Sequence, residues 1–128
     1  MMDNLQNVSF HTSTPDEIVA TMLAELQETM GDMAEELLSD LIPMLLEDAP
    51  PMFAGLRQAI TDGNGPKVKE LAHTFKGSCA SMGIKALAAH CQAIENMGRD
   101  NQLEEALPRL AHAAAEYEQV KQALNRYV

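Results

Sequence analysis

The sequence contains no tryptophan, and aromatic residues of any kind make up only 4% of its 128 residues. Its apolar residues are mostly Leu, Ala, Met and Ile, and few are the β-branched and aromatic types that favour strands. No segment alternates apolar and polar residues as a half-buried strand does. Seven glycines and six prolines are also too few for a low-complexity chain. We therefore predict an all-α fold.

Basic residues are absent before Arg57, whereas eleven acidic residues lie between Asp3 and Asp48. From Arg57 onward nine basic residues meet eight acidic ones, and the formal net charge of the chain is -10. A surface of this sign repels phosphate backbones and anionic lipid headgroups. We expect no nucleic acid and no membrane among the partners, and the plain interpretation of the acidic half is a solvated face.

Long hydrophobic runs are absent too, since none approaches the roughly 18 apolar residues of a membrane span. The first ten residues lack the basic and apolar regions of a signal peptide. The two cysteines, Cys79 and Cys91, form neither a disulfide framework nor a zinc-ligand spacing, and both fall on apolar stripes of expected helices. These features indicate a cytoplasmic protein with two core thiols and no metal site.

Residues 1–13 show no periodicity and are expected to form a flexible arm ahead of one helical domain over residues 14–128. Thr14, Pro15 and Glu17 have the spacing of a helix N-terminus with a capping box, and a short apolar stripe follows them. This pattern predicts a short first helix.

A second cap signature, Asp32 with Glu35, predicts a longer helix, which Pro43 should kink. Pro50 and Pro51 either kink or break it before the apolar pattern resumes, and the sequence leaves both possibilities open. Further helices are expected over residues 66–82, over residues 84–97 and from about residue 101, with turns at residues 62–66, Gly83 and Gly98, and with Pro108 as a possible kink.

Short connections between long amphipathic helices imply that successive helices run antiparallel. We therefore predict an antiparallel four-helix bundle with an additional short N-terminal helix across one end.

The helix over residues 66–82 turns one histidine away from its apolar face. Counting about 100° per residue from His73, six residues fall between roughly 160° and 260° and form the buried stripe: Val68, Leu71, Ala72, Phe75, Cys79 and Met82. His73 therefore faces solvent, bordered on the same face by Lys69, Lys76, Gly77 and Ala80. A lone exposed histidine is usually a plain surface residue, so its neighbours decide the interpretation.

Gly77 is informative because glycine inside a helix costs about 0.5 to 1 kcal/mol relative to alanine. A tight helix crossing would explain it, but Gly77 lies only about 40° from His73, on the solvent side. Lys69 and Lys76 are either solubilising charges or groups that place positive charge where an anion on His73 would sit. We interpret the cluster as a reactive histidine that another backbone approaches closely.

A longer run of residues around His73 forms a recognisable signature: Ala72-His73-Thr74-Phe75-Lys76-Gly77-Ser78, followed by Met82-Gly83, Leu87, Cys91 and Glu95. It resembles the signature of histidine-containing phosphotransfer (HPt) domains, with its His-x-x-Lys-Gly core. Phe75 departs mildly from the family, in which many members have Leu there, and this should alter only the packing.

The resemblance implies that the exposed histidine takes a phosphoryl group from the aspartate of one response-regulator receiver domain and passes it to another. His73 matches the phosphorylated position, Lys76 the basic neighbour, and Gly77 the small residue that lets the receiver approach. Lys69 and Ala80 complete the expected binding surface. A hybrid sensor histidine kinase stands among the implied partners, and we expect the chain itself to be a monomer.

No Gly-rich phosphate loop or other nucleotide-binding motif is found, so we expect a relay without kinase activity of its own and without a cofactor. In-line transfer depends on positioning and charge neutralisation, most of which the receiver's Mg²⁺ site would supply.

Two other readings compete with phosphotransfer. Glu70-x-x-His73 matches half of a di-iron bundle site, but the other helical histidines, His90 and His112, lack a glutamate three residues earlier. We interpret both as solvated or boundary residues. The stronger alternative is a non-catalytic helical-bundle adaptor that docks a partner without phosphotransfer, and phosphate on His73 distinguishes the two.

Overall fold

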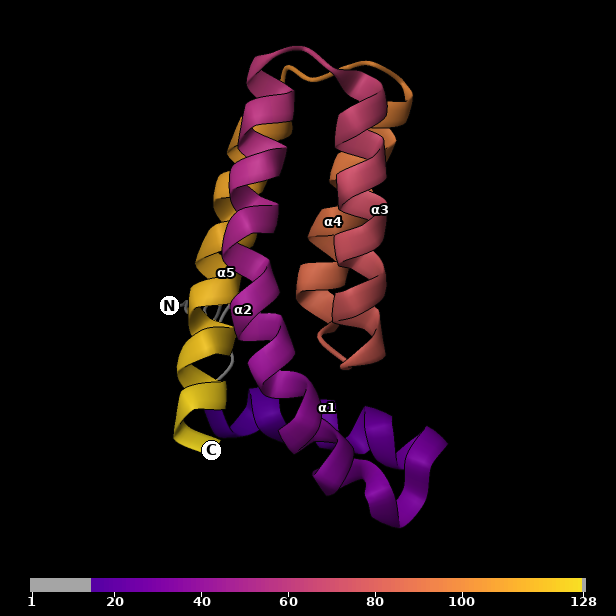
Figure 1. Cartoon of the computed structure of the whole chain (residues 1–128), viewed down its shortest axis with the longest axis vertical. Coiled ribbons are helices and arrows are strands. Elements are labelled where there is room, and N and C mark those ends of the chain that lie inside the picture. The colour runs from indigo at the N-terminus through magenta and orange to yellow at the C-terminus, as the bar shows by residue number, and fades with distance from the viewer. Residues whose placement is uncertain (1–14, 128) are drawn as a thin grey trace, which may run out of the picture.

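The computed structural model describes residues 15–127, and every element within them is helical (Figure 1). The elements are α1 (Pro15–Met30), the short 3-10 helix η2 (Gly31–Met33), α2 (Ala34–Thr61), α3 (Gly65–Ser81), α4 (Lys85–Arg99) and α5 (Ala106–Tyr127). The predicted all-α class is confirmed. The expected flexible arm over residues 1–13 and the expected Thr14 cap lie outside the described residues.

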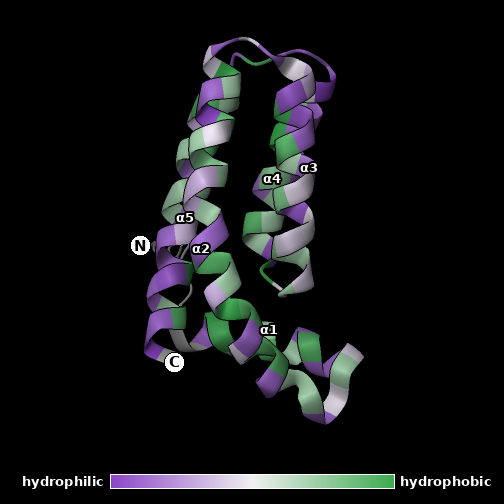
Figure 2. Cartoon of the chain, viewed as in Figure 1, coloured by the Kyte–Doolittle hydropathy of each residue, from purple (hydrophilic) through white to green (hydrophobic). Residues whose placement is uncertain are grey.

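Helices α2 to α5 form the bundle, with α2 beside α5 and α3 beside α4 (Figure 1). Each is joined to the next by a short connection that reverses the chain, so sequence neighbours are antiparallel, as predicted. Helix α1 lies at the lower end of the bundle and contacts α2 and α5. Apolar and polar residues alternate around the helices, as amphipathic packing requires (Figure 2).

The core consists of two clusters of buried apolar residues stacked along the bundle. Phe53 of α2 packs against both and contacts two other aromatic rings, Phe75 of α3 at 5.3 Å and Tyr117 of α5 at 5.5 Å between centroids. No polar or charged residue is buried among those that the structure describes. The core thus holds one face of α3 by apolar packing, and the polar residues of α3 lie outside this core.

Helix α2 is continuous through Pro43, Pro50 and Pro51, which settles the choice between kink and break. All three prolines are exposed. Proline has no backbone N–H, so the carbonyl four residues earlier loses its partner. On an exposed face of the helix water can replace that hydrogen bond, and its loss costs least there. The lower part of α2 bends away from the axis of its upper part (Figure 1).

Three of the predicted helix ends are wrong. Asp32 does not cap α2, which begins at Ala34 without a side-chain cap because η2 leads directly into it. The last helix begins at Ala106, five residues later than predicted, after a loop in which Asn101 has φ 55°. Pro108 consequently lies in the first turn of α5, where proline is tolerated, and does not kink the helix.

Gly98 is the third, because it does not stop the preceding helix. Helix α4 runs through it to Arg99, and a Cβ on Gly98 would lie 2.6 Å from the backbone nitrogen of Lys69 and 2.7 Å from the carbonyl oxygen of Gly65. The backbones of α3 and α4 therefore touch at this point. The start of α3 is capped nearby by Asn64, whose side chain accepts a hydrogen bond of 3.1 Å from the backbone N–H of Lys67.

Candidate functional site

His73 lies in the middle of α3 with 66% of its side chain exposed. Its exposure follows from the apolar residues on the opposite face of α3, where Ala72, Phe75 and Cys79 are buried against the rest of the bundle. The helix geometry predicted from the sequence thus holds at this position. A buried helix face anchors the imidazole, while its edge stays open to a second molecule.

The imidazole is held by Glu95 of α4, a contact that the sequence did not predict. Nδ1 of His73 lies 3.0 Å from Oε2 of Glu95, within hydrogen-bond distance. Only 13% of the Glu95 side chain is exposed, compared with 66% for His73. The carboxylate therefore lies at the base of the ring, between α3 and α4, and the far edge of the ring points outward.

Lys76 contacts the other oxygen of the same carboxylate. Its ammonium group lies 2.9 Å from Oε1 of Glu95 and donates a hydrogen bond of 3.0 Å to Oε1 of Gln92. Oε1 of Glu95 is buried and has no aligned hydrogen-bond donor, so the ammonium compensates it as an ion pair. Gln92 in turn donates to Asn96, at 3.0 Å. The expected basic neighbour of His73 thus acts first on Glu95.

These contacts decide the charge of Glu95. The ammonium of Lys76 is the main cause that lowers the pKa of the Glu95 carboxyl below its ordinary value; partial burial opposes this, and the hydrogen bond with His73 adds to it. Glu95 is therefore ionised at neutral pH and accepts hydrogen bonds only. It follows that Nδ1 of a neutral His73 carries the ring proton and that Nε2, on the outward edge, keeps a free lone pair.

Gly77 lies in open space one turn after His73. A Cβ added there would meet no atom within 4 Å, apart from its own helix backbone and immediate neighbours. A tight helix crossing therefore does not explain this glycine; the close crossing of α3 and α4 is at Gly65 and Gly98. Ala80, another turn along the same face, is exposed as well. The surface around His73 is low and unobstructed.

Lys69 lies one turn before His73, exposed, and forms no ion pair within residues 15–127. Its ammonium is available to an incoming anion, in contrast to that of Lys76. Glu70 turns away from His73 and pairs with Lys67 at 3.3 Å. The five residues that the sequence predicted thus share one face of α3, and Lys76 alone is drawn from it toward α4.

The two remaining helical histidines lie elsewhere, between α4 and α5. His90 is half-buried, and its Nδ1 is 3.4 Å from Nη1 of Arg109; His112 is exposed, with its ring centroid 6.4 Å from that of His90. Burial, and then the charge of Arg109, lower the pKa of His90. In the described part of the chain, no three His, Cys, Asp or Glu residues are grouped so that they could hold a metal ion.

Cys79 and Cys91 are both buried in the core between α3 and α4. The neighbouring Cys91 thiol and burial raise the pKa of Cys79, so this sulfur stays a protonated thiol. The interpretation of both cysteines as core thiols is confirmed. No helix within residues 15–127 is long and apolar enough to span a membrane.

Comparison with known proteins shows which family the chain belongs to. The model of the Hpt domain matches residues 17–123. The chain belongs to the Hpt domain family. A solved structure, the histidine-containing phosphotransfer protein B (HptB) of Pseudomonas aeruginosa PAO1, resembles it with a TM-score of 0.68 and 27% sequence identity, covering 83% of this chain and 89% of that one. A search of curated protein sequences finds no match.

Family membership confirms the resemblance inferred from the motif around His73. Hpt proteins are intermediates of histidine phosphotransfer in two-component signalling, where they interact with receiver domains and kinases. The Hpt chain described here takes part in that class of relay.

Glu95 and Gln92 are the site residues that the sequence analysis missed. Glu95 entered it only as part of the family signature, although it directly follows Ile94 on the apolar stripe of its helix. An acidic residue at the edge of a stripe, on a helix joined to its neighbour by a short turn, indicates a side chain directed at that neighbour. Which residue it meets depends on the rotation of α4 against α3, which the Gly65–Gly98 crossing fixes.

Proposed function

We propose that this chain is a phosphorelay intermediate that accepts a phosphoryl group on Nε2 of His73 from a receiver aspartate and passes it to a second receiver. One observation carries the proposal: an exposed imidazole has its Nδ1 bound to a partly buried carboxylate, so its reactive nitrogen faces outward beside an open glycine. A non-catalytic adaptor requires no such polar arrangement beneath an exposed ring.

The transfer step balances without a base on this chain. The lone pair of Nε2 attacks the phosphorus of the aspartyl phosphate, and the N–P bond forms as the O–P bond breaks. The bonding electrons leave with the oxygen, which becomes the receiver's carboxylate. Nδ1 keeps its proton, so the ring becomes positively charged in the product. Glu95, ionised and 3.0 Å from Nδ1, stabilises that charge.

The two lysines then have different parts. Lys69, exposed and without an ion pair, is free to screen the phosphoryl group on His73. Lys76 keeps Glu95 ionised and in place. The receiver supplies the Mg²⁺ that neutralises the charge in flight. We propose further that the chain is a monomer, that it does not phosphorylate itself from ATP, and that a hybrid sensor histidine kinase starts the relay.

The deciding experiment incubates the chain with Mg²⁺ and a panel of receiver domains phosphorylated on their aspartates. Label should move to the chain as an acid-labile, base-stable adduct, and His73→Gln should abolish it while the helical circular dichroism signal stays unchanged. His112→Gln is the matched control, because it removes another exposed histidine and should label like wild type. Transfer to His73→Gln would place the phosphate on another residue and contradict the assignment of His73, whereas no transfer from any receiver would favour the adaptor.

A further inference from the structure

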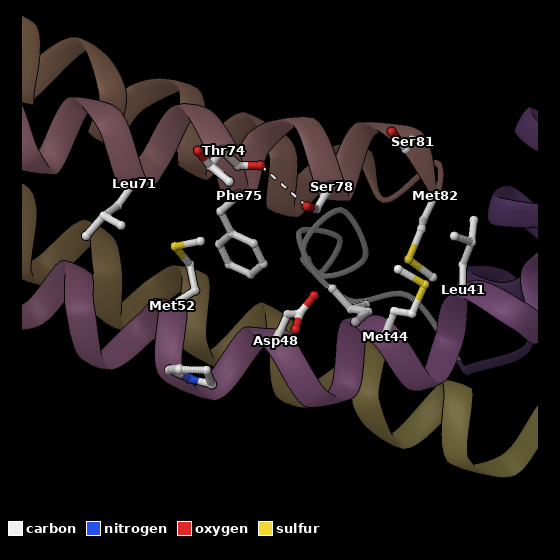
Figure 3. A pocket seen from close by; sticks show the side chains of 12 residues that line it. Leu41, Met44, Asp48, Met52, Leu71, Thr74, Phe75, Ser78, Ser81 and Met82 are labelled. Atoms are coloured by element: carbon white, nitrogen blue, oxygen red, sulfur yellow. Dashed lines mark hydrogen bonds between the residues drawn. The ribbon is translucent and has the colours of Figure 1, made fainter.

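A groove runs between α2 and α3, on the flank of α3 opposite to α4 (Figure 3). It encloses a cavity of about 480 Å³, enough for several apolar side chains of a partner. Its walls are mainly apolar and include Leu41, Met44 and Met52 from α2 and Leu71 and Phe75 from α3. Met44 is one of the few large apolar side chains that the structure leaves exposed, at 57%.

One charged side chain lines this groove. Asp48 lies on α2 between Met44 and Met52 and directs its carboxylate into the gap between the two helices (Figure 3). It has no hydrogen bond or ion pair with any residue that the structure describes. Lys67 of α3 lies one turn before the lining residue Leu71 and is paired with Glu70, at 3.3 Å. Among residues 15–127, the cavity thus has mainly apolar walls and one negative charge without a partner.

The groove is continuous with the surface around His73. On α3, Gly77, Ser81, Thr74 and Ser78 fill the sector between roughly 40° and 140° from His73, counting about 100° per residue. All four are exposed and small. The three hydroxyl groups donate back to carbonyls of α3, at 2.9 Å for Ser81, 3.1 Å for Thr74 and 3.4 Å for Ser78. Because these hydroxyl groups already donate to α3, a partner need not accept hydrogen bonds from them. The strip leads from the ring of His73 to the groove.

A partner that covers His73 and follows this strip also covers Asp48. If its contacting face were only apolar, it would strip water from the carboxylate without replacing it, and an uncompensated buried charge is strongly unfavourable. A lysine or arginine among its apolar side chains repays that cost. An unpaired charge inside an apolar contact therefore discriminates between otherwise similar partners.

We propose that Asp48 selects among the receivers that cover His73 and this groove, and that it favours those whose contacting face presents a lysine or arginine among its apolar residues. This inference rests on the proposed function, since the partner is the receiver that exchanges phosphate with His73. The charge of this half of the chain agrees with it, because no basic residue precedes Arg57. Asp48 is a specificity residue and takes no part in the chemical step.

The test uses the full chain and the receiver of the panel that labels His73 fastest. Asp48→Lys should slow transfer from this receiver by about tenfold or more, because it sets like charges against each other. Asp48→Asn, which removes the charge with little change of shape, should slow transfer less and weaken its dependence on salt. Replacing the matching lysine or arginine of the receiver by glutamate should restore transfer to Asp48→Lys.

Two controls separate docking from chemistry. Glu47→Lys makes the same charge change at a neighbouring residue that does not line the groove, and it should transfer nearly as wild type does. Phosphoramidate, a small phosphoryl donor that needs no docking surface, should label His73 equally in all variants.

The proposal is overturned if Asp48→Lys accepts phosphate at the wild-type rate, or if Glu47→Lys slows transfer as much. In either case the phosphorelay function stands, because receivers still label His73. It is overturned as well if Asp48→Lys loses labelling by phosphoramidate, since a disturbed His73 would then explain the slower transfer. If no receiver labels wild-type His73, the proposed function fails and this inference fails with it.

Discussion

The carboxylate of Glu95 is shared by two side chains of α3, with His73 on one oxygen and Lys76 on the other. Each contact depends on the other, because Lys76 keeps the carboxylate ionised and an ionised carboxylate fixes the proton of His73 on Nδ1. The ring nitrogen that we propose as the phosphate acceptor is therefore set by a pair of residues, and a motif centred on His73 alone does not account for it.

Removing this carboxylate should slow transfer. Glu95→Ala leaves the ring without its acceptor, and the loss of one charged hydrogen bond, worth about 1.5 to 3 kcal/mol, corresponds to a rate lower by roughly ten- to a hundredfold. Glu95→Gln keeps an acceptor oxygen but no charge, so its rate should lie between those of Glu95→Ala and wild type. Receiver-to-chain transfer rates measure this. Glu70→Gln is the control, because Glu70 lies on α3 with His73 but pairs with Lys67, and its rate should be unaffected. A wild-type rate in Glu95→Ala would remove Glu95 from the site.

Gly77 should lower the stability of the folded chain but let a receiver approach His73. Because a Cβ at this position meets nothing, Gly77→Ala should raise the free energy of unfolding by up to about 1 kcal/mol. Gly77→Gln should fold but hold a receiver away from His73 and slow transfer. Thermal melts and transfer rates on the same variants check both. Transfer to Gly77→Gln at the wild-type rate would contradict the access argument.

Among the elements, α3 and α4 form the hairpin that holds the site, and its geometry depends on a glycine. The sequence predicted α3 to within a residue at each end and predicted which face it buries, because its apolar spacing and turn residues agree. It did not predict that Gly98 is a crossing point. A glycine near the expected end of a helix has the same local pattern whether it stops the chain or admits a neighbouring backbone, and only the packing of α3 against α4 separates the two.

The same limit applies to α2 and α5. The three prolines of α2 are tolerated because all three are exposed while the apolar residues of the helix are held by the core. The local sequence shows the cost of each proline but not the packing that offsets it. The delayed start of α5 depends on residues 100–105, which form the loop between α4 and α5. The spacing of apolar residues does not show that these residues form a loop. Glu95 could be located on a helix, but its partner could not be predicted before the two helices were placed.

Gly98→Ala tests the crossing directly and should have the opposite effect to Gly77→Ala. Its Cβ would lie 2.6 Å from the backbone nitrogen of Lys69, and neither backbone can move aside as a flexible side chain would. We expect a loss of roughly 1 to 3 kcal/mol in the free energy of unfolding. Urea denaturation of the two alanine variants side by side decides it. Equal stability of Gly98→Ala and wild type would mean that α3 and α4 do not touch there.

For the whole molecule, stability should depend on pH partly through Glu95. Its pKa is lowered in the folded state, so its contribution is fully present above the pKa of the unfolded carboxyl, about 4.3, and is lost as the pH falls through the lower folded value. Because the other carboxylates of this acidic chain titrate as well, the contribution is measured as a difference between two proteins.

The two proteins are His73→Gln and the double variant His73→Gln with Glu95→Gln. In the first, the contact with Lys76 is the main charged interaction of Glu95, and in the second that interaction is removed. Denaturation at several pH values should give a difference in the free energy of unfolding that is constant near neutral pH and shrinks below about pH 4. A difference that does not vary with pH would mean that Glu95 is not stabilised as a carboxylate.

His73 and Glu95 are 22 residues apart and are joined through a single tight turn at Gly83, which has φ 76°. Contacts this local in sequence require little loop closure, and such contacts form early in folding. The reactive ring and its carboxylate should therefore meet while the chain is still collapsing, before α5 and α1 complete the bundle. The hairpin that holds the site would then serve as a preformed surface onto which α5, the next helix in the chain, packs.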